Sequence, residues 1–275
     1  MPTDLAAKAA RLLQMHQGPK ILVLPNAWDA ASARIFEQAG FEALGTTSAG
    51  IAASLGYPDG EAVSRDEMLD VVRRIARTVA IPVTADVEGG YGPTVDDAEA
   101  TARGVLDAGA AGLNFEDKHA AGLLDTDSQA ERIRAIRRVA GAAGVPLVIN
   151  ARTDVYLLPV GPAESWFDET VRRANLYRDA GADCLFVPGV RDAETIGKLT
   201  KAIRGPVNIL ALAGVPPAAE LQRLGVARVS SGSGPMRAAM SLTRRVAEEL
   251  KGSGTYTTIT EGVITHQEAN RLMGV

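Results

Sequence analysis

The sequence has a single cysteine, no long apolar run and almost no excess of charge. Because Cys184 is the only cysteine among 275 residues, the chain can form no internal disulfide, and we expect a reducing, cytoplasmic location. No apolar run approaches the ~18 residues that a membrane helix needs, and the N-terminus lacks the profile of a signal peptide. We therefore expect no membrane partner.

The net charge is −4, with 23% charged residues, which gives no electrostatic reason to expect nucleic acid or an acidic membrane surface as a partner. A short basic cluster at helical spacing is typical of a solvated helix face; its members are Arg132, Arg134, Arg137 and Arg138. Hydrophobic residues make up 46% of the chain, enough at this length to bury a large core.

Two kinds of strand signal alternate along the chain. Four short apolar runs follow a glycine placed to end a helix: Ala43–Thr47, Gly112–Phe115, Cys184–Val187 and Ala227–Ser231. Four others follow a proline, which cannot continue a helix: Ile21–Leu24, Val83–Asp86, Leu147–Asn150 and Val207–Leu210. The sequence therefore predicts eight short strands.

The segments between these strands carry apolar residues at three- and four-residue spacing, which predicts helices at 31–38, 65–79, 95–108, 129–140 and 165–180. Strands that alternate with helices imply a parallel sheet, and eight units predict an α/β fold of the (β/α)8 TIM type. A doubly wound open sheet is the alternative, but no G-x-G-x-x-G follows the first strand. We expect one domain over 1–275, with a helix at about 4–14 before the barrel and a helical extension at about 241–275 after it, where Thr265 and Glu268 have capping-box spacing.

Acidic residues collect where the predicted strands end, which is where barrel enzymes carry their chemistry. Asp86 and Glu88 are two positions apart, so both project toward the same side, and Glu116 follows the neighbouring strand. Like charges this close are costly unless a cation or a proton compensates for them. Oxygen ligands without His or Cys favour Mg²⁺, or Mn²⁺, over zinc. We predict a metal site formed by these three carboxylates.

Two other polar groups at these ends allow two interpretations each. Arg152 could bind a substrate carboxylate or stabilise developing negative charge, or it could form a structural salt bridge with Asp154 or Glu116. Thr47 and Ser48 could donate hydrogen bonds to a substrate carboxylate, or they could simply cap the following loop.

The motifs at 24–29, 84–92, 116–118 and 150–154 resemble those of the phosphoenolpyruvate mutase/isocitrate lyase superfamily, in order and along nearly the whole chain. The resemblance implies C-terminal helices exchanged between the subunits of a homodimer or homotetramer. It also implies that Asp86 binds Mg²⁺, with Glu88 and Glu116 acting largely through water. A small 2-oxo acid would chelate the metal, and a C–C or P–C bond would break through a metal-stabilised enolate.

The resemblance assigns roles to further residues. The catalytic residues would be Asp59, Lys118 and Arg152, and the substrate contacts would be Thr47, Ser48, Asp86, Arg152 and Asn208.

The sequence departs from the isocitrate lyases in two places. The loop at 118–125 lacks their Lys-x-Cys-Gly-His segment, and we expect Cys184 to be only a small buried residue of a strand. The chain has Val187-Pro188-Gly189 where the lyases carry an acid. We therefore expect a C–C lyase or decarboxylase with a smaller 2-oxo acid substrate. The alternatives are a phosphoenolpyruvate phosphonomutase and a catalytically weak binder of 2-oxo dicarboxylates.

Overall fold

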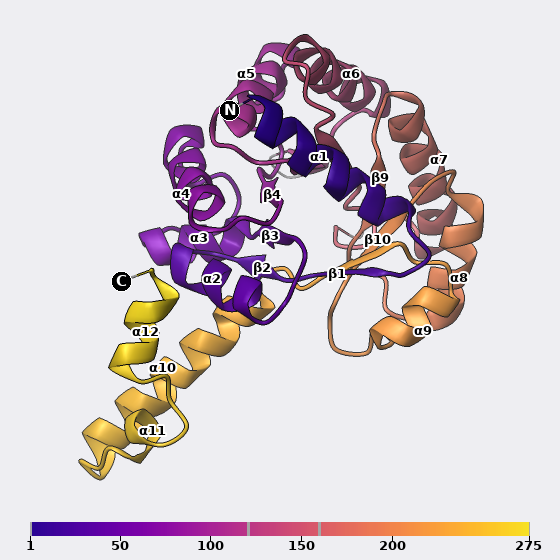
Figure 1. Ribbon diagram of the computed structural model, residues 1–275. Helices are drawn as coiled ribbons and strands as arrows, with labels where there is room; N and C mark the ends of the chain where they lie inside the picture. Colours follow the sequence, from indigo (N-terminus) through magenta and orange to yellow (C-terminus); the bar gives the residue numbers. More distant parts are fainter. Residues whose placement is uncertain (1, 120–121, 159–160, 275) are drawn as a thin grey trace.

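The computed structural model describes residues 2–119, 122–158 and 161–274 and shows strands ringed by helices (Figure 1). The barrel strands are β1 Leu22–Leu24, β2 Asn26–Ala27, β3 Leu44–Thr46, β4 Val83–Asp86, β5 Gly112–Glu116, β8 Val148–Arg152, β9 Cys184–Val187, β10 Val207–Leu210 and β11 Arg228–Ser230. They pair in parallel in the order β1-β11-β10-β9-β8-β5-β4-β3-β2. The predicted (β/α)8 TIM-type fold is confirmed; the first predicted strand, 21–24, corresponds to β1, and the strand is continued beyond Pro25 by the short β2.

The division falls at Pro25, at the point where the barrel closes. β1 pairs with β11, whereas β2 pairs with β3. Proline has no N–H to donate, so a continuous ladder is interrupted there. Asn26 joins the two sides: its Oδ1 accepts from the N–H groups of Ser231 and Gly232, each at 2.9 Å, and its Nδ2 donates to the Thr46 carbonyl at 2.7 Å. Asn26 of β2 therefore connects the residues that follow β11 to β3.

Helices cover the outside of the barrel. They are α2 Ala30–Gln38, α3 Ser48–Leu55, α4 Arg65–Thr78, α5 Val95–Asp107, α6 Thr126–Ala142, α7 Trp166–Asp179, α8 Ala193–Ala202 and α9 Ala218–Arg223. The helix α1 Pro2–Gln17 packs Ala9 and Leu12 against Ala111 and Val148 and so covers one end of the barrel. The predicted helices are present, and α3, α8 and α9 are additional to them.

The interior of the barrel is polar. Leu113 and Ile149 belong to the core that packs against the helices, and residues on a strand alternate between its two faces. The residues that alternate with them, Asn114 and Asn150, therefore point inward, and both are buried. Barrels of this type usually fill this space with branched apolar side chains, so the polar interior calls for a hydrogen-bonding explanation.

Arg132 corrects one expectation from the sequence. The predicted basic face includes this residue, but its side chain is only 1% exposed. It donates to the carbonyls of Gly89 and Gly92, the second at 2.7 Å, and its guanidinium lies 4.6 Å from the centre of the Phe115 ring. Helical spacing did not reveal this because the carbonyls belong to a loop that is distant in sequence.

The C-terminal helices are α10 Gly234–Gly252, α11 Thr257–Thr260 and α12 His266–Leu272, and α10 extends away from the barrel (Figure 1). Thr265 caps α12 by accepting from the Glu268 N–H at 3.2 Å, as the capping spacing predicts. Within the described ranges, every helix is too short or too polar to span a bilayer. That the whole chain forms one domain stays a prediction.

The buried histidine of α1 predicts how stability depends on pH. His16 donates from Nδ1 to the Leu12 carbonyl, and burial, reinforced by the positive charge of Arg228, lowers the pKa of His16 from 6.5 to about 4. The unfolded chain therefore binds a proton at higher pH than the folded chain does. The contribution of His16 is present above pH 6.5 and is lost as the pH falls toward 4, by up to about 3 kcal/mol.

Urea unfolding at several pH values between 7 and 4 checks this expectation. Compared with the native chain, His16→Gln should show a free energy of unfolding that falls less steeply with decreasing pH across that interval. Equal slopes for the two proteins would show that His16 is not the group responsible.

Candidate active site

Asp86, at the end of β4, is held by hydrogen bonds at the barrel mouth, where the carboxyl ends of the strands open. Its Oδ2 accepts from both the N–H and the hydroxyl of Ser48, each at 2.9 Å, and its Oδ1 accepts from Asn114 Nδ2 at 3.4 Å. Ser48 is the first residue of α3, where the helix dipole favours a negative charge. The backbone of Asp86 is held too, because its N–H donates to Thr46 Oγ1. Asp86 therefore has a fixed orientation.

Glu88 belongs to a strained group of three residues. Glu61, Glu88 and Tyr91 have φ angles of 59°, 50° and 62°, and within the described ranges no other residue except glycine has a positive φ. The Glu61 N–H donates to Glu88 Oε2 at 2.7 Å, and the Tyr91 N–H donates to Glu61 Oε1 at 2.8 Å. Non-glycine residues adopt this conformation at a cost, and such strain concentrates at functional sites. The three residues connect the loop after α3 to the glycine-rich loop after β4.

Glu116, at the end of β5, faces Arg152 at the end of β8. The Arg152 Nη1–Glu116 Oε2 distance is 2.7 Å, and Arg152 also contacts Asp154 with Nε–Oδ1 and Nη2–Oδ2 distances of 2.5 and 2.8 Å. In this structure the guanidinium is therefore bound by two carboxylates. Of the two interpretations of Arg152 that the sequence allows, the structure contains the salt bridges, with both Glu116 and Asp154.

Asp117 anchors this part of the mouth from behind. It is fully buried and accepts from the Asp154 N–H at 3.0 Å, from the Tyr177 hydroxyl at 2.8 Å and from Arg173 Nη1 at 3.1 Å. Asp154 is in turn the bidentate partner of Arg152. Asp117 therefore fixes the loop that orients Arg152.

The carboxylates of the mouth influence one another's ionisation. Burial, together with repulsion from Asp86 and Asp59, raises the pKa of Glu88 to about 7. Burial also raises the pKa of Glu116 well above its ordinary value, although the positive charge of Arg152 opposes this. Crowded carboxylates with raised pKa values form an environment in which a cation is stabilised.

A small hollow of about 80 Å³ lies beside these carboxylates. It is lined by Gly60, Glu61, Glu88, Glu116, Lys118 and His119. Lys118 and His119 form β6, which pairs with β7 Gly122–Leu123 in a short hairpin. Residues 120 and 121 of the predicted loop lie outside the described residues. At roughly 30 Å³ per water, the hollow has room for a few water molecules.

The donor set fits a hard cation held mainly through water. Among the described residues, no three His, Cys, Asp or Glu side chains are arranged as a ready set of direct ligands. Glu88 and Glu116 are engaged by Glu61 and Arg152, whereas Asp86 accepts only from uncharged donors. Mg²⁺ usually keeps several waters and takes one or two carboxylates directly, so this arrangement suits it.

Two of the remaining predicted site residues make local contacts instead. Thr47 caps α3 by accepting from the Gly50 N–H at 3.3 Å. Asn208 is fully buried and donates to Ser230 Oγ at 3.2 Å, so it does not line the hollow. Sequence reasoning missed Glu61, Tyr91 and Asn114, since only the folded chain brings them to the carboxylates.

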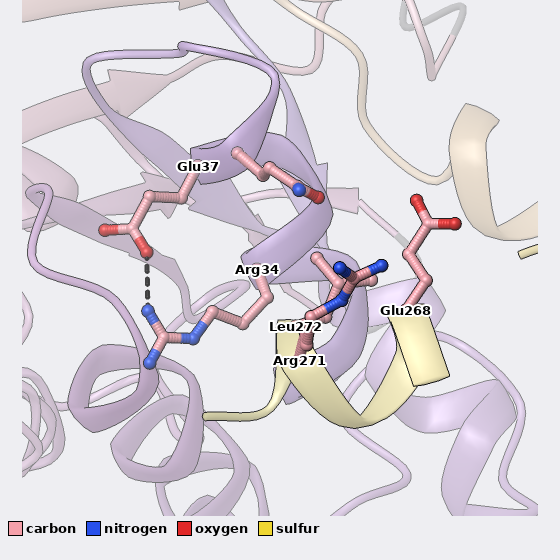
Figure 2. A pocket seen from close by; sticks show the side chains of 6 residues that line it. Arg34, Glu37, Glu268, Arg271 and Leu272 are labelled. Carbon is pink, nitrogen blue, oxygen red and sulfur yellow. Dashed lines mark hydrogen bonds and ion pairs between the residues drawn. The ribbon is translucent and has the colours of Figure 1, made fainter. Parts of the chain in front are cut away.

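A second hollow lies outside the mouth, between α2 and α12 (Figure 2). Arg34 and Glu37 form an ion pair at 2.8 Å on one side, and Glu268 and Arg271 of α12 lie on the other. These groups are charged residues of two helices, and their hydrogen bonds within the described residues do not reach the barrel mouth. We therefore place the active site at the mouth.

A parallel barrel that carries acids, a guanidinium and a lysine at the carboxyl ends of its strands defines a barrel enzyme. The chain matches the phosphoenolpyruvate phosphomutase family over residues 12–251 and belongs to it, within the phosphoenolpyruvate mutase/isocitrate lyase superfamily. The predicted superfamily is confirmed.

Three of the similar proteins are enzymes that are named for related but different reactions. The chain is 30% identical to a 2-methylisocitrate lyase of Halalkalibacterium halodurans, over 97% of this chain and 90% of that protein. It is 30% identical to an oxaloacetate decarboxylase of Bradyrhizobium diazoefficiens, over 73% and 70% of the two chains. A solved 2,3-dimethylmalate lyase superposes with a TM-score of 0.86 at 29% identity, over 97% and 95%. The chain is an enzyme of this superfamily, in which C–C and P–C bonds are cleaved.

The buried position of Asp117 predicts a large loss of stability on its removal. Asp117→Ala would leave Arg173 and the Tyr177 hydroxyl without their shared acceptor, so we expect the free energy of unfolding to fall by about 3 to 5 kcal/mol. The matched control is Glu194→Ala, which removes an exposed partner of Lys198 and should cost about 0.5 kcal/mol or less. Urea unfolding measures both; a loss below about 1 kcal/mol for Asp117→Ala would contradict its role as an anchor.

Proposed function

We propose that the enzyme uses Mg²⁺, or Mn²⁺ in its place, to cleave a C–C bond of a small 2-oxo acid. The observation that carries the proposal is the group of three crowded carboxylates at the barrel mouth, of which Asp86 is fixed and Glu88 and Glu116 have raised pKa values. A dication would relieve this repulsion. The relatives that act on methylisocitrate and oxaloacetate support a carboxylic acid substrate.

Asp86 would hold the cation directly, and Glu88 and Glu116 would hold its water ligands. When bound, Mg²⁺ supplies the Lewis acid that stabilises the negative charge of an enolate. Ser48 keeps the Asp86 carboxylate turned toward the mouth with two hydrogen bonds. The Glu61–Glu88 hydrogen bond couples the loop that carries Asp59 to the same site.

The proposed catalytic residues are Asp59, Lys118 and Arg152, of which Lys118 lines the small hollow. Arg152 forms an ion pair with Glu116, which lines the hollow, and would stabilise negative charge at the reacting end of the substrate. Lys118 lines the hollow, and the negative charge of Asp59 contributes to the raised pKa of Glu88; both observations support a role for these residues in acting on a ligand there. Thr47, Ser48 and Asn208 stay proposed substrate contacts; Ser48 would contribute only if its bonds to Asp86 rearrange.

A small substrate fits this site better than a tricarboxylate. The hollow is small, and the hairpin that follows β5 carries no cysteine in its described part. Cys184 is buried in β9, where burial raises its pKa to about 12, so it is a neutral thiol with no access to a substrate. The predicted role of Cys184 as a small buried residue agrees with this. A cytoplasmic location stays a prediction.

We also propose a homodimer or homotetramer built through the C-terminal helices. Only Met236 of the 19 residues of α10 is buried, and large apolar side chains are exposed along α10 to α12; they are Met240, Leu242, Leu250, Tyr256, Ile259, Val263, Ile264 and Met273. Exposed apolar surface of this extent is typical of a protein interface. A second copy of the chain, with its own C-terminal helices exchanged, is the occupant that we propose.

A pyruvate-release screen tests the proposed reaction. The native enzyme with Mg²⁺ should release pyruvate or a homologous 2-oxo acid from at least one small substituted malate or 2-oxo dicarboxylate. Asp86→Ala should lower the rate at least about 100-fold, since the Lewis acid lowers the activation barrier by several kcal/mol.

The control for this variant is Asp96→Asn, an exposed acid of α5, which should keep the native rate. Interconversion of phosphoenolpyruvate and phosphonopyruvate without release of pyruvate would favour a mutase, and binding without any turnover would favour a weak binder. Full activity of Asp86→Ala would remove the proposed metal site.

Light scattering tests the assembly. The native chain should have two or four times its own mass of 28.8 kDa. Because a charge within a buried apolar interface is strongly unfavourable, Met240→Glu combined with Leu250→Glu should shift the mass toward that of one chain. The control is Ser241→Glu combined with Arg245→Glu on the same helix, and an unchanged mass for the apolar pair would place the interface elsewhere.

A further inference from the structure

Arg228 is a buried cation in the centre of the barrel. It lies on β11, is 0% exposed and forms no ion pair within the described residues. Its one hydrogen bond runs from Nη2 to Asn114 Oδ1 at 3.2 Å, and its Nε and Nη1 have no partner among those residues. Burying a charge without a counter-ion costs several kcal/mol, so its presence needs a physical reason.

Two titratable groups that interact electrostatically with Arg228, Cys184 and His16, do not neutralise its positive charge. Burial raises the pKa of Cys184 to about 12 and lowers that of His16 to about 4, so both are neutral near pH 7. Burial lowers the pKa of Arg228 to about 10, and Asp86 is among the groups whose negative charge opposes this. The compensating carboxylate therefore belongs to the mouth above.

Asn114 connects Arg228 to Asp86 by hydrogen bonds. Its Oδ1 accepts from Arg228 Nη2 at 3.2 Å and from Asn150 Nδ2 at 2.7 Å, and its Nδ2 donates to Asp86 Oδ1 at 3.4 Å. An arginine can only donate, so its contact forces the oxygen of the amide toward Arg228. The amide nitrogen must then face Asp86. The opposite orientation would direct an oxygen at a carboxylate and a nitrogen at a guanidinium.

We propose that Arg228 is a positioning residue that fixes the metal-binding carboxylate Asp86 through the Asn114 amide. With Ser48 on Oδ2 and Asn114 on Oδ1, Asp86 is held on both oxygens and presents one orientation to a cation. This inference rests on the proposed function, because it needs a cation at Asp86.

Titration of the full-length chain with Mn²⁺, without substrate, tests the proposal by the electron paramagnetic resonance signal of the free ion. Arg228→Met should weaken binding about tenfold, as removal of groups that orient metal ligands does. Arg228→Lys keeps a charged donor and should stay within about threefold of the native affinity. A purely electrostatic role predicts the reverse for Arg228→Met, since removing a nearby positive charge favours a cation.

A double-mutant cycle tests whether the effect passes through Asn114. Asn114→Ala should weaken Mn²⁺ binding about tenfold, and Arg228→Met combined with it should cause no further loss. Asn114→Ala also serves as the test if Arg228→Met does not fold. The matched control, Val105→Ala, removes two buried carbons of α5 and should lower stability without changing the affinity for Mn²⁺.

The outcomes are distinguishable. Failure of the native chain to bind Mn²⁺ would overturn the proposed function and, with it, this inference. Native binding with equal or tighter binding by Arg228→Met, or with unchanged binding by Asn114→Ala, would overturn the positioning role alone. Additive losses in the double variant would show that Arg228 does not act through Asn114.

Discussion

The structure depends on keeping several carboxylates close together at one mouth of a barrel where little water reaches them. Asp86, Glu88 and Glu116 are each less than a tenth exposed. The negative charge of Asp86 raises the pKa values of Glu88 and Glu116, and that of Glu88 raises the pKa of Glu116. Repulsion between buried like charges would normally separate them or keep them protonated. The elements around the mouth supply hydrogen bonds and a positive charge that stabilise these carboxylates.

Each carboxylate is stabilised by a different interaction. Asp86 takes hydrogen bonds from the start of α3, Glu116 takes an ion pair from Arg152, and Glu88 takes a backbone N–H from the strained residue Glu61. The hydrogen bonds leave Asp86 without a counter-ion among the described residues, whereas the ion pair with Arg152 neutralises Glu116. This difference is why Asp86 is the group best suited to bind a cation directly, with Glu116 in an outer position.

Most of the fold could be predicted from the sequence because its signals are local. Glycines and prolines mark the strand starts, and the acids at the strand ends follow from the parallel topology. The division of the first strand at Pro25 could have been found from the proline itself, since it removes a donor from the ladder. Arg132 could not, because the carbonyls that bury it belong to a loop about forty positions earlier in the chain.

The polar centre of the barrel shows the same limit. Asn114 and Arg228 are separated by 114 positions, and neither is a motif residue. Arginine in a short strand is usually interpreted as an edge or surface residue. Only the register that sets β11 beside β1 and β10 shows that it is inside.

Asn114, Asn150 and Arg228 form a polar layer inside the barrel, where branched apolar side chains usually lie in this fold. The apolar core of this chain lies instead between the strands and the helices, where residues such as Leu113, Ile136 and Leu185 are buried together. The residues that pack against the helices and the residues that form the site therefore lie on opposite faces of the same strands. Since successive side chains alternate between these faces, a change in the interior can alter the orientation of a site residue while leaving the outer core in place. That separation lets a single strand such as β5 carry Leu113 for packing, Asn114 for orientation and Glu116 for the site.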